Sequence, residues 1–216
     1  MKKCFKSLFL IFFSLTLILS PLRFQAKENT SSMTISCNKA CCQLRLVQQK
    51  LWIDHISWTR SFIVSDLASL KDKDAVLERL LKNQDDIGNS FKPYYGEEIG
   101  NKLSKLLREH IEIAGQVVAA AKNNDSSNLG KYNKLWYENA DQIAAFLSRI
   151  NPNYQNEVLQ EMLYKHLQLL TDQVVARLNA DWKADIKAYD EGEEHMIMFA
   201  DLLAMGIMKQ FPESFK

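Results

Sequence analysis

An internal repeat limits the folds that this chain can adopt. Three segments of its first half recur in the same order in its second half: 51–55 matches 135–139, 76–84 matches 158–166, and 109–119 matches 194–204. Repeated units bury their apolar faces against one another. Because two copies are too few for an open solenoid, the sequence predicts a closed domain in which a pseudo-twofold rotation relates the repeats, at about 46–123 and 129–211.

The spacing of apolar residues indicates helices throughout. Glycine and proline number only 7 and 4 among 216 residues, and the alternation typical of strands is missing. We expect helices at about 38–70, 73–91, 97–122, 129–150, 155–179 and 182–210, with breaks at 92–96 and 123–128. Short connections make consecutive helices antiparallel neighbours. The predicted fold is therefore all-α: duplicated three-helix units form one six-helix domain over residues 38–216, packed like a four-helix bundle.

The first 26 residues have the pattern of a secretory signal peptide. Three lysines stand within the first six residues, an almost wholly apolar run follows from 8 to 19, and Ala26 is a small residue suited to cleavage. The polar residues 27–37 are predicted to be a flexible leader. We therefore expect an exported protein that is extracellular, bound to the cell surface or periplasmic. The alternative is an uncleaved signal helix that anchors the domain to a membrane.

Each matched segment carries a polar residue at the same place in both halves. The pairs are His55 with Asn139, Gln84 with His166, and His110 with His195, and they include all four histidines of the chain. Apolar residues stand three or four positions away from each, so helical spacing places all six on a buried stripe. Buried polar groups are costly unless they have partners. We therefore expect partners, or a ligand, for these side chains in the core.

A transition-metal site would supply such a ligand. Neutral imidazole commonly binds copper, zinc, nickel and iron, and helix bundles build metal sites from side chains on facing helices. The histidines stand on the first, third, fifth and sixth predicted helices, where they can converge at one level. The predicted metal ligands are His55, His110, His166 and His195, with Glu191, Gln84 and Asn139 as supporting polar residues.

Other interpretations of the six positions stay open. A hydrogen-bonded polar layer can fix helix register without any ligand, and the histidines can also lie apart or exposed. A carboxylate-rich di-iron site is disfavoured because the chain has no Glu-x-x-His, and c-type haem is excluded because it has no Cys-x-x-Cys-His. A b-type haem with two histidine ligands would give Gln84 and Asn139 no obvious role in the site.

Three cysteines follow the predicted signal peptide, and their role is open. Cys37 and Cys41 are one helical turn apart, while Cys41 and Cys42 are adjacent. A structural or intermolecular disulfide, a soft-metal site and unreactive thiols are all compatible with this spacing.

Charge and motifs narrow the function classes. Without residues 1–26 the chain has 23 basic and 26 acidic residues, which gives no indication of nucleic-acid binding. It lacks a nucleophile elbow, a phosphate-binding loop and the metalloprotease motif His-Glu-x-x-His. The sequence therefore favours a binding protein over an enzyme. The expected partner is a metal ion or small ligand, and membrane contact is expected only through an uncleaved signal.

Three motifs resemble a group of secreted bacterial proteins. They are LWxxHxxWTRxxI at 51–63, NQDDIGN at 83–89 and KAYDEG at 187–192. Over about residues 48–215 the chain is similar to helical-bundle proteins of unassigned activity. The resemblance implies a helical fold and export, and it supplies no catalytic residue.

Overall fold

Six α-helices make up most of residues 39–216, the part of the chain that the computed structural model describes. They are α1 (Lys39–Leu67), α2 (Lys73–Tyr95), α3 (Glu97–Lys122), α4 (Ser126–Ile150), α5 (Asn156–Leu178) and α6 (Trp182–Gln210), followed by the 3-10 helix η1 (Pro212–Phe215). These residues contain no strand, so the all-α prediction is confirmed. The predicted signal peptide and leader at 1–37 lie outside the described residues.

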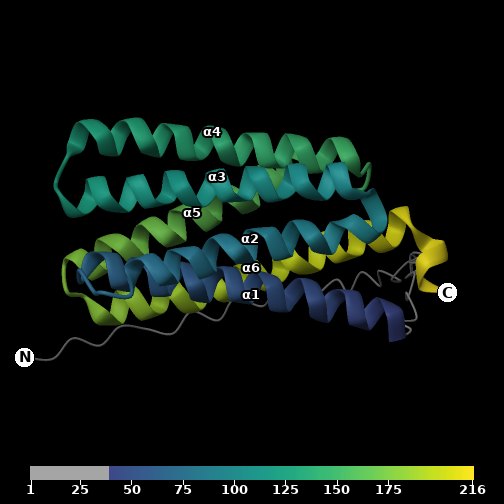
Figure 1. Cartoon of the computed structure of the whole chain (residues 1–216), viewed down its shortest axis with the longest axis horizontal. Coiled ribbons are helices and arrows are strands. Elements are labelled where there is room, and N and C mark those ends of the chain that lie inside the picture. Colours follow the sequence, from purple (N-terminus) through teal and green to yellow (C-terminus); the bar gives the residue numbers. More distant parts are fainter. Residues whose placement is uncertain (1–38) are drawn as a thin grey trace, which may run out of the picture. The chain divides into compact units, whose positions relative to one another are not determined.

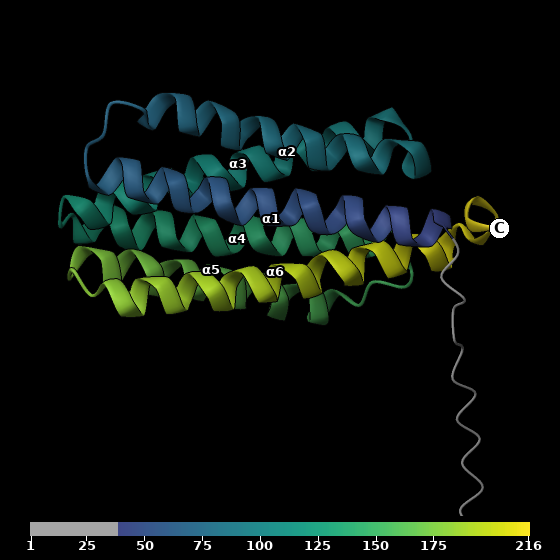
Figure 2. The same cartoon turned by 90° about the horizontal axis from the view of Figure 1, so that it is seen from below.

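The helices form a closed antiparallel ring. Each helix packs against its neighbours in the chain, and α6 packs back on α1 (Figures 1 and 2). Arg45 and Gln49 on α1 hold this last interface, because both bond the carboxylate of Asp201 on α6. The inward faces of the six helices share one main apolar core. No helix among residues 39–216 is both long and apolar enough to cross a membrane.

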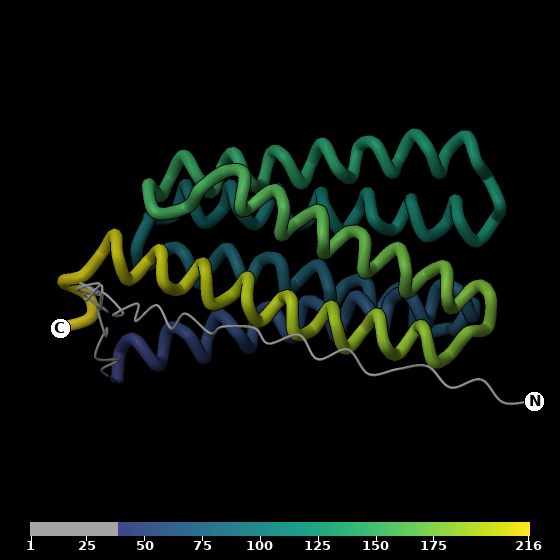
Figure 3. Tube along the Cα trace, turned by 180° about the vertical axis from the view of Figure 1, so that it is seen from behind, coloured from purple at the N-terminus to yellow at the C-terminus, as the bar shows by residue number. Residues whose placement is uncertain are grey.

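Three of the connections are the same turn. In each, one residue adopts a left-handed conformation: Ser69, Asn124 and Ala180 have φ angles of 53°, 54° and 56°. The next amide then bonds the carbonyl oxygen five residues before it, from Leu70 to Ser65, from Asp125 to Ala120 and from Asp181 to Ala176. This is the Schellman ending of a helix. The turns lie together at one end of the bundle (Figure 3), so the ring consists of three αα-hairpins, each formed by an odd-numbered helix and the next helix.

Three predicted helix boundaries are wrong, and the first is the end of α1, which lies at Leu67 and not at 70. The break expected at 92–96 does not interrupt α2, which continues through Pro93 to Tyr95. A proline removes one helical hydrogen bond, but here it falls in the last turn, where Tyr95 stacks on Phe91 with ring centroids 5.6 Å apart. The loop expected at 123–128 is shorter, because the Asp125 side chain accepts a hydrogen bond from the Asn128 amide and caps α4 three residues early.

A glycine pair fixes how α2 passes α3. A Cβ atom at Gly88 would lie 2.5 Å from the Gly100 carbonyl oxygen, and one at Gly100 would lie 2.7 Å from the Gly88 carbonyl oxygen. Only glycine allows two backbones to approach so closely. Gly88 is one turn beyond Gln84, so this contact also sets the height of Gln84 relative to α3.

Candidate functional site

Three histidines meet inside the ring, one from each hairpin. His55, His110 and His166 stand near the middle of α1, α3 and α5, and each is 2–3% exposed. The ring centroid of His166 lies 5.4 Å from that of His55 and 6.2 Å from that of His110. We call these three residues the histidine layer. The predicted convergence of histidines therefore occurs for three of the four.

Gln84 on α2 orients the imidazole of His55. The Gln84 amide nitrogen donates to the Leu80 carbonyl oxygen at 2.8 Å, which turns its oxygen, Oε1, towards His55. His55 Nδ1 lies 3.2 Å from that oxygen and must be the donor. In a neutral imidazole the other nitrogen, Nε2, then carries a lone pair, and it points into the layer.

Asn139 on α4 orients His110 in the same way. Its amide nitrogen donates to the Leu106 carbonyl oxygen at 3.2 Å, and its oxygen accepts from His110 Nδ1 at 2.7 Å. The Nε2 lone pair of His110 then accepts a hydrogen bond from the indole nitrogen of Trp136 at 3.0 Å. Both ring nitrogens of His110 are therefore satisfied.

His166 has the least complete set of partners. Its Nε2 lies 3.4 Å from His55 Nε2, which is longer than the usual 2.9–3.0 Å of an N–H hydrogen bond. Its Nδ1 is buried and has no hydrogen-bond partner among the described residues. A buried polar atom left in this state is costly. His166 is thus the member of the layer whose ring nitrogens are least satisfied by hydrogen bonds within the described residues.

Burial keeps the layer uncharged. Desolvation lowers the pKa of His55 to about 3 and the pKa of His110 to about 4. The pKa of His166 is lowered well below its usual value, first by burial and then by repulsion from His55, His110 and His195. All three imidazoles are therefore neutral near pH 7, and the neutral form is the one that binds metals.

A hydrogen bond to a neighbouring helix repeats in all three hairpins. In each hairpin, a side chain of the second helix donates to a backbone carbonyl oxygen of the first helix. The three bonds run from Asn83 to Leu51 at 3.0 Å, from Asn139 to Leu106 at 3.2 Å and from His195 to Met162 at 2.7 Å. Each accepting residue stands four positions before the layer histidine of the same hairpin. The repeated bond sets the same register between the two helices of each hairpin.

Two predicted site residues are not members of the layer. His195 is only partly buried, and its Nε2 is used by the Met162 carbonyl oxygen. Glu191 is exposed at the surface of α6, where its carboxylate lies 3.7 Å from the ammonium of Lys187. Of the supporting residues, Gln84 and Asn139 contact layer histidines, whereas Glu191 faces solvent.

Sequence reasoning missed Trp136 and Asn83 as partners. Trp136 had the spacing of a core residue, and it is buried, but its indole N–H also bonds the layer. A tryptophan three positions before a buried asparagine was the available signal. Asn83 shares a hydrogen bond of 3.2 Å with Gln84 and lies beside it in sequence.

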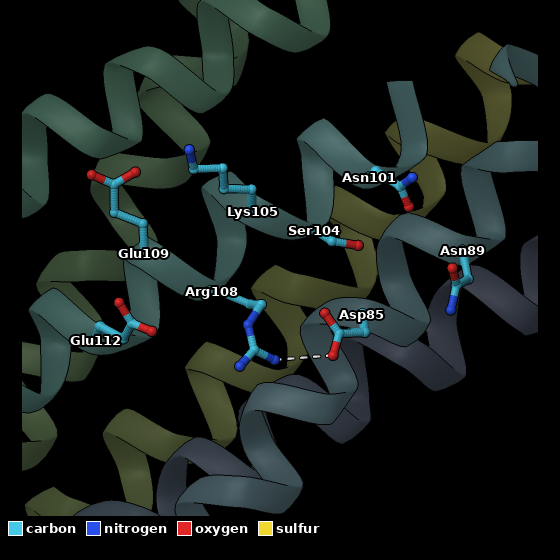
Figure 4. Close-up of a pocket in the computed structure, with 8 residues that line it drawn as sticks. All are labelled: Asp85, Asn89, Asn101, Ser104, Lys105, Arg108, Glu109 and Glu112. Atoms are coloured by element: carbon cyan, nitrogen blue, oxygen red, sulfur yellow. Dashed lines mark hydrogen bonds and ion pairs between the residues drawn. The ribbon is translucent and has the colours of Figure 1, made fainter. Parts of the chain in front are cut away.

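A strongly charged surface depression lies elsewhere. Figure 4 shows it on α2 and α3, where Arg108 points towards Asp85 and pairs with it at 2.9 Å, while Glu109 and Glu112 extend from the far side. It is open to solvent and contains no member of the layer. Its charges are those of a solvated helix surface, so it is a weaker candidate than the buried histidines.

The cysteines also lie apart from the layer. Cys41 is buried in the first turns of α1 and Cys42 is exposed. Cys37 lies outside the described residues, so the alternatives for the three thiols stay open.

No ready-made site with three or more histidine, cysteine or carboxylate ligands occurs within residues 39–216. The arrangement that does occur is a pair of imidazole nitrogens, with a third imidazole beside them that is engaged by Trp136. Comparison of the chain with family models, curated proteins and solved structures gives no match.

Proposed function

We propose that this protein is an exported metal-binding bundle whose histidine layer holds a transition metal ion such as copper, zinc, nickel or iron(II). His55 and His166 are the ligands that the folded chain already brings together, and His110 is the third. Gln84 and Asn139 orient the ligands. His195 and Glu191 lie outside this inner set.

The spacing of two nitrogens carries the proposal. Two imidazole nitrogens bound to a tetrahedral metal at 2.0–2.1 Å lie about 3.3–3.4 Å from each other. The Nε2 atoms of His55 and His166 are 3.4 Å apart. This separation suits a shared metal ion better than a direct hydrogen bond, and the site is buried among neutral side chains.

The amide side chains supply the support that metal-binding histidines usually have. A ligating histidine commonly donates its second ring N–H to an oxygen atom, which fixes the tautomer and the orientation of the ring. His55 does so to Gln84, and His110 does so to Asn139. In both rings the lone pair is thus held on Nε2; that of His55 faces His166, and that of His110 accepts the Trp136 indole N–H.

His110 joins the site only when Trp136 gives up its hydrogen bond. Its Nε2 lone pair accepts the hydrogen bond from the indole N–H. The same lone pair cannot bind a metal ion at the same time. A rotation of the indole would free the third ligand. A metal bound to Nε2 of His166 would place the proton of this neutral ring on Nδ1, a buried nitrogen that has no hydrogen-bond acceptor among the described residues.

The test uses protein recovered from the cell exterior without a histidine tag. Its melting temperature is measured with copper, zinc, nickel, manganese and iron(II), each against a chelator control. A metal that binds only the native state stabilises it by about 2.7 kcal/mol at a hundred times its dissociation constant. We expect His166→Gln and His55→Gln to abolish the rise. His195→Gln is the matched control and should retain the rise, because the glutamine amide can still donate to the Met162 carbonyl oxygen. A wild-type protein indifferent to all five metals would refute the proposal.

The second candidate function is a polar layer that only fixes helix register. The observation in its favour is the complete hydrogen bonding of His110, with Asn139 on one side and Trp136 on the other. On this account the glutamine variants lose stability, by about 1–3 kcal/mol for an imperfectly satisfied buried group, and no metal raises the melting temperature of any form. The same titrations therefore separate the two functions.

Two further proposals concern the whole chain. Export rests on the signal-like residues 1–26, and N-terminal sequencing of exported protein tests it. The pseudo-twofold duplication rests on the matched segments at offsets of 82–85 residues. Superposing residues 46–123 on 129–211 tests the duplication. The turn and the interhelical hydrogen bond that recur in all three hairpins favour a threefold repeat of hairpins over a twofold repeat of halves.

A further inference from the structure

An apolar cavity lies next to the histidine layer. It has a volume of about 100 Å³ and is bounded by α1, α2, α3, α4 and α5. Residues four positions after the layer histidines form its near wall, and residues eight positions after them continue it. These are Thr59, Ala114 and Leu170, followed by Ile63, Val118 and Val174. The cavity therefore extends from the layer towards the end of the bundle that carries the three hairpin turns.

The wall offers an occupant no free hydrogen-bond donor. The Thr59 hydroxyl donates to the His55 carbonyl oxygen at 2.7 Å, and the Thr171 hydroxyl donates to the Leu167 carbonyl oxygen at 2.9 Å. The indole N–H of Trp136, the remaining polar group of the wall, is bonded to His110. No ionisable side chain lines the cavity. Water needs two to four polar partners to stay in such a place, so the cavity favours an apolar occupant.

The side of the cavity nearest solvent is formed by residues of α3, α4 and α5. Val175, which contributes to the wall, is 50% exposed, and Leu129 and Ala121 at the same side are partly exposed. An occupant that enters from this side meets no charged residue of the wall. Cores are normally close-packed, and an unfilled hole costs stability, so a ligand that fills it gains contacts that the folded chain lacks.

We propose that this cavity is a binding site for a small apolar molecule about the size of a xenon atom or a benzene ring. A dry cavity of about 150 Å³ is known to accept benzene or xenon. The cavity here, at about 100 Å³, suits the smaller of these without change. Binding there does not depend on the proposed metal site, although the two share Trp136 as a common wall.

The experiment follows methyl NMR signals of metal-free protein, in chelator, as xenon is added. We expect saturable shifts of the Ala114 and Val118 methyl signals. Ala114→Leu fills the cavity and should abolish the saturable shift at Val118. Ala145→Leu, on the exposed side of α4, is the matched control and should leave both shifts intact. Absence of a saturable shift in the wild type, or its persistence in Ala114→Leu, overturns the proposal.

A second variant keeps the test decisive if Ala114→Leu does not fold. Val118→Ala removes two methyl groups from the wall and enlarges the cavity towards the volume that accepts benzene. Benzene should then raise its melting temperature more than that of the wild type, whereas pyridine, which has the same shape but needs a hydrogen-bond donor, should not. Equal effects of the two probes, or none from benzene, overturn the proposal.

One cross-check separates this inference from the proposed function. His55→Gln should lose the response to metals and keep the response to xenon. Ala114→Leu should keep the response to metals and lose the response to xenon. Failure of one response without the other shows which of the two sites is absent.

Discussion

The Nε2 atoms of His55 and His166 lie 3.4 Å apart, although their helices, α1 and α5, are not neighbours in the ring. The contact crosses the interior of the bundle and joins the first hairpin to the third. It depends on the register of both hairpins at once, which the bonds from Asn83 to Leu51 and from His195 to Met162 set.

Replacing Trp136 with phenylalanine tests whether the hydrogen bond from Trp136 prevents His110 from binding the metal. The variant keeps an aromatic ring but leaves His110 Nε2 buried without a donor, so metal-free protein should lose about 1–3 kcal/mol of unfolding free energy. Metal affinity should rise, because the lone pair is free. Trp52→Phe is the control, since the Trp52 indole N–H has no hydrogen-bond partner among the described residues. Calorimetric titration of both variants measures the affinities, and unchanged metal binding in Trp136→Phe would argue against a third ligand.

The pH dependence of stability follows from the lowered pKa values. Unfolding returns His55 from a pKa of about 3, and His110 from a pKa of about 4, to the ordinary value of 6.5, and it also removes the burial that lowers the pKa of His166. Below pH 6.5 these histidines take up protons in the unfolded chain but stay neutral in the folded chain. The unfolding free energy is therefore highest above pH 6.5 and decreases as the pH falls below it. Each such group removes about 1.4 kcal/mol per pH unit well below its unfolded-state pKa.

Urea unfolding between pH 7.5 and 5 measures this loss in a range where most carboxylates stay ionised. We expect His55→Gln to have a shallower slope than the wild type, because one titrating group is gone. His195→Gln serves for comparison. A wild-type unfolding free energy that is flat across this range would contradict the burial of neutral histidines.

Glycine at the third hairpin turn should stabilise the protein. Ala180 has a φ angle of 56°, a conformation that costs a residue with a Cβ atom about 1–2 kcal/mol. Glycine removes this cost but gains freedom in the unfolded state, worth about 0.4–1 kcal/mol, so Ala180→Gly should raise the unfolding free energy by up to about 1 kcal/mol. Asn124→Gly should gain less, since asparagine tolerates this conformation. Ala145→Gly, inside α4, should instead lose stability in the same denaturant titration.

The buried carboxylate of Asp185 should be essential for stability. It accepts from Arg60 at 2.8 Å and from Arg177 at 2.6 Å, which joins α1, α5 and α6. Asp185→Asn would leave both guanidinium groups without a charge partner. We expect a loss of about 3 kcal/mol in thermal unfolding, near the lower end for a broken buried pair, because the arginines keep some contact with water. Asp190→Asn, exposed on the same helix, should change little; equal effects would show that the ion pairs are weak.

Much of the fold follows from the sequence because helices are local. The limits predicted for α3 and α6 agree with the structure, since each ends where glycine, asparagine or proline stands close by. The apolar stripe also identified five polar residues that are buried. Pro93 defeated the prediction because its place in the last helical turn, and the stacking of Tyr95 beyond it, outweigh its usual effect.

The arrangement of the histidines required the structure. A stripe shows that a side chain faces inward, but its height relative to other helices depends on the turns. Ser69, Asn124 and Ala180 turn the chain without a glycine to mark the position. One signal was nevertheless present: His55, His110 and His166 follow one another at 55 and 56 residues, the same spacing as these three turns. The sequence matches between the two halves, at offsets of 82–85 residues, pointed to a twofold repeat and not to this period of 55–56 residues.

The closing of α6 onto α1 also bears on how the protein folds. Five of the six interfaces of the ring join consecutive helices, which need only short loops to meet. The sixth brings together residues as distant as Arg45 and Asp201, 156 positions apart. Local pairings are expected to form first, so the ring closes last, and the contact of His166 with His55 arises at that step. Until then α1 and α6 present open apolar faces, and a second copy of the chain can compete for them by exchanging a hairpin.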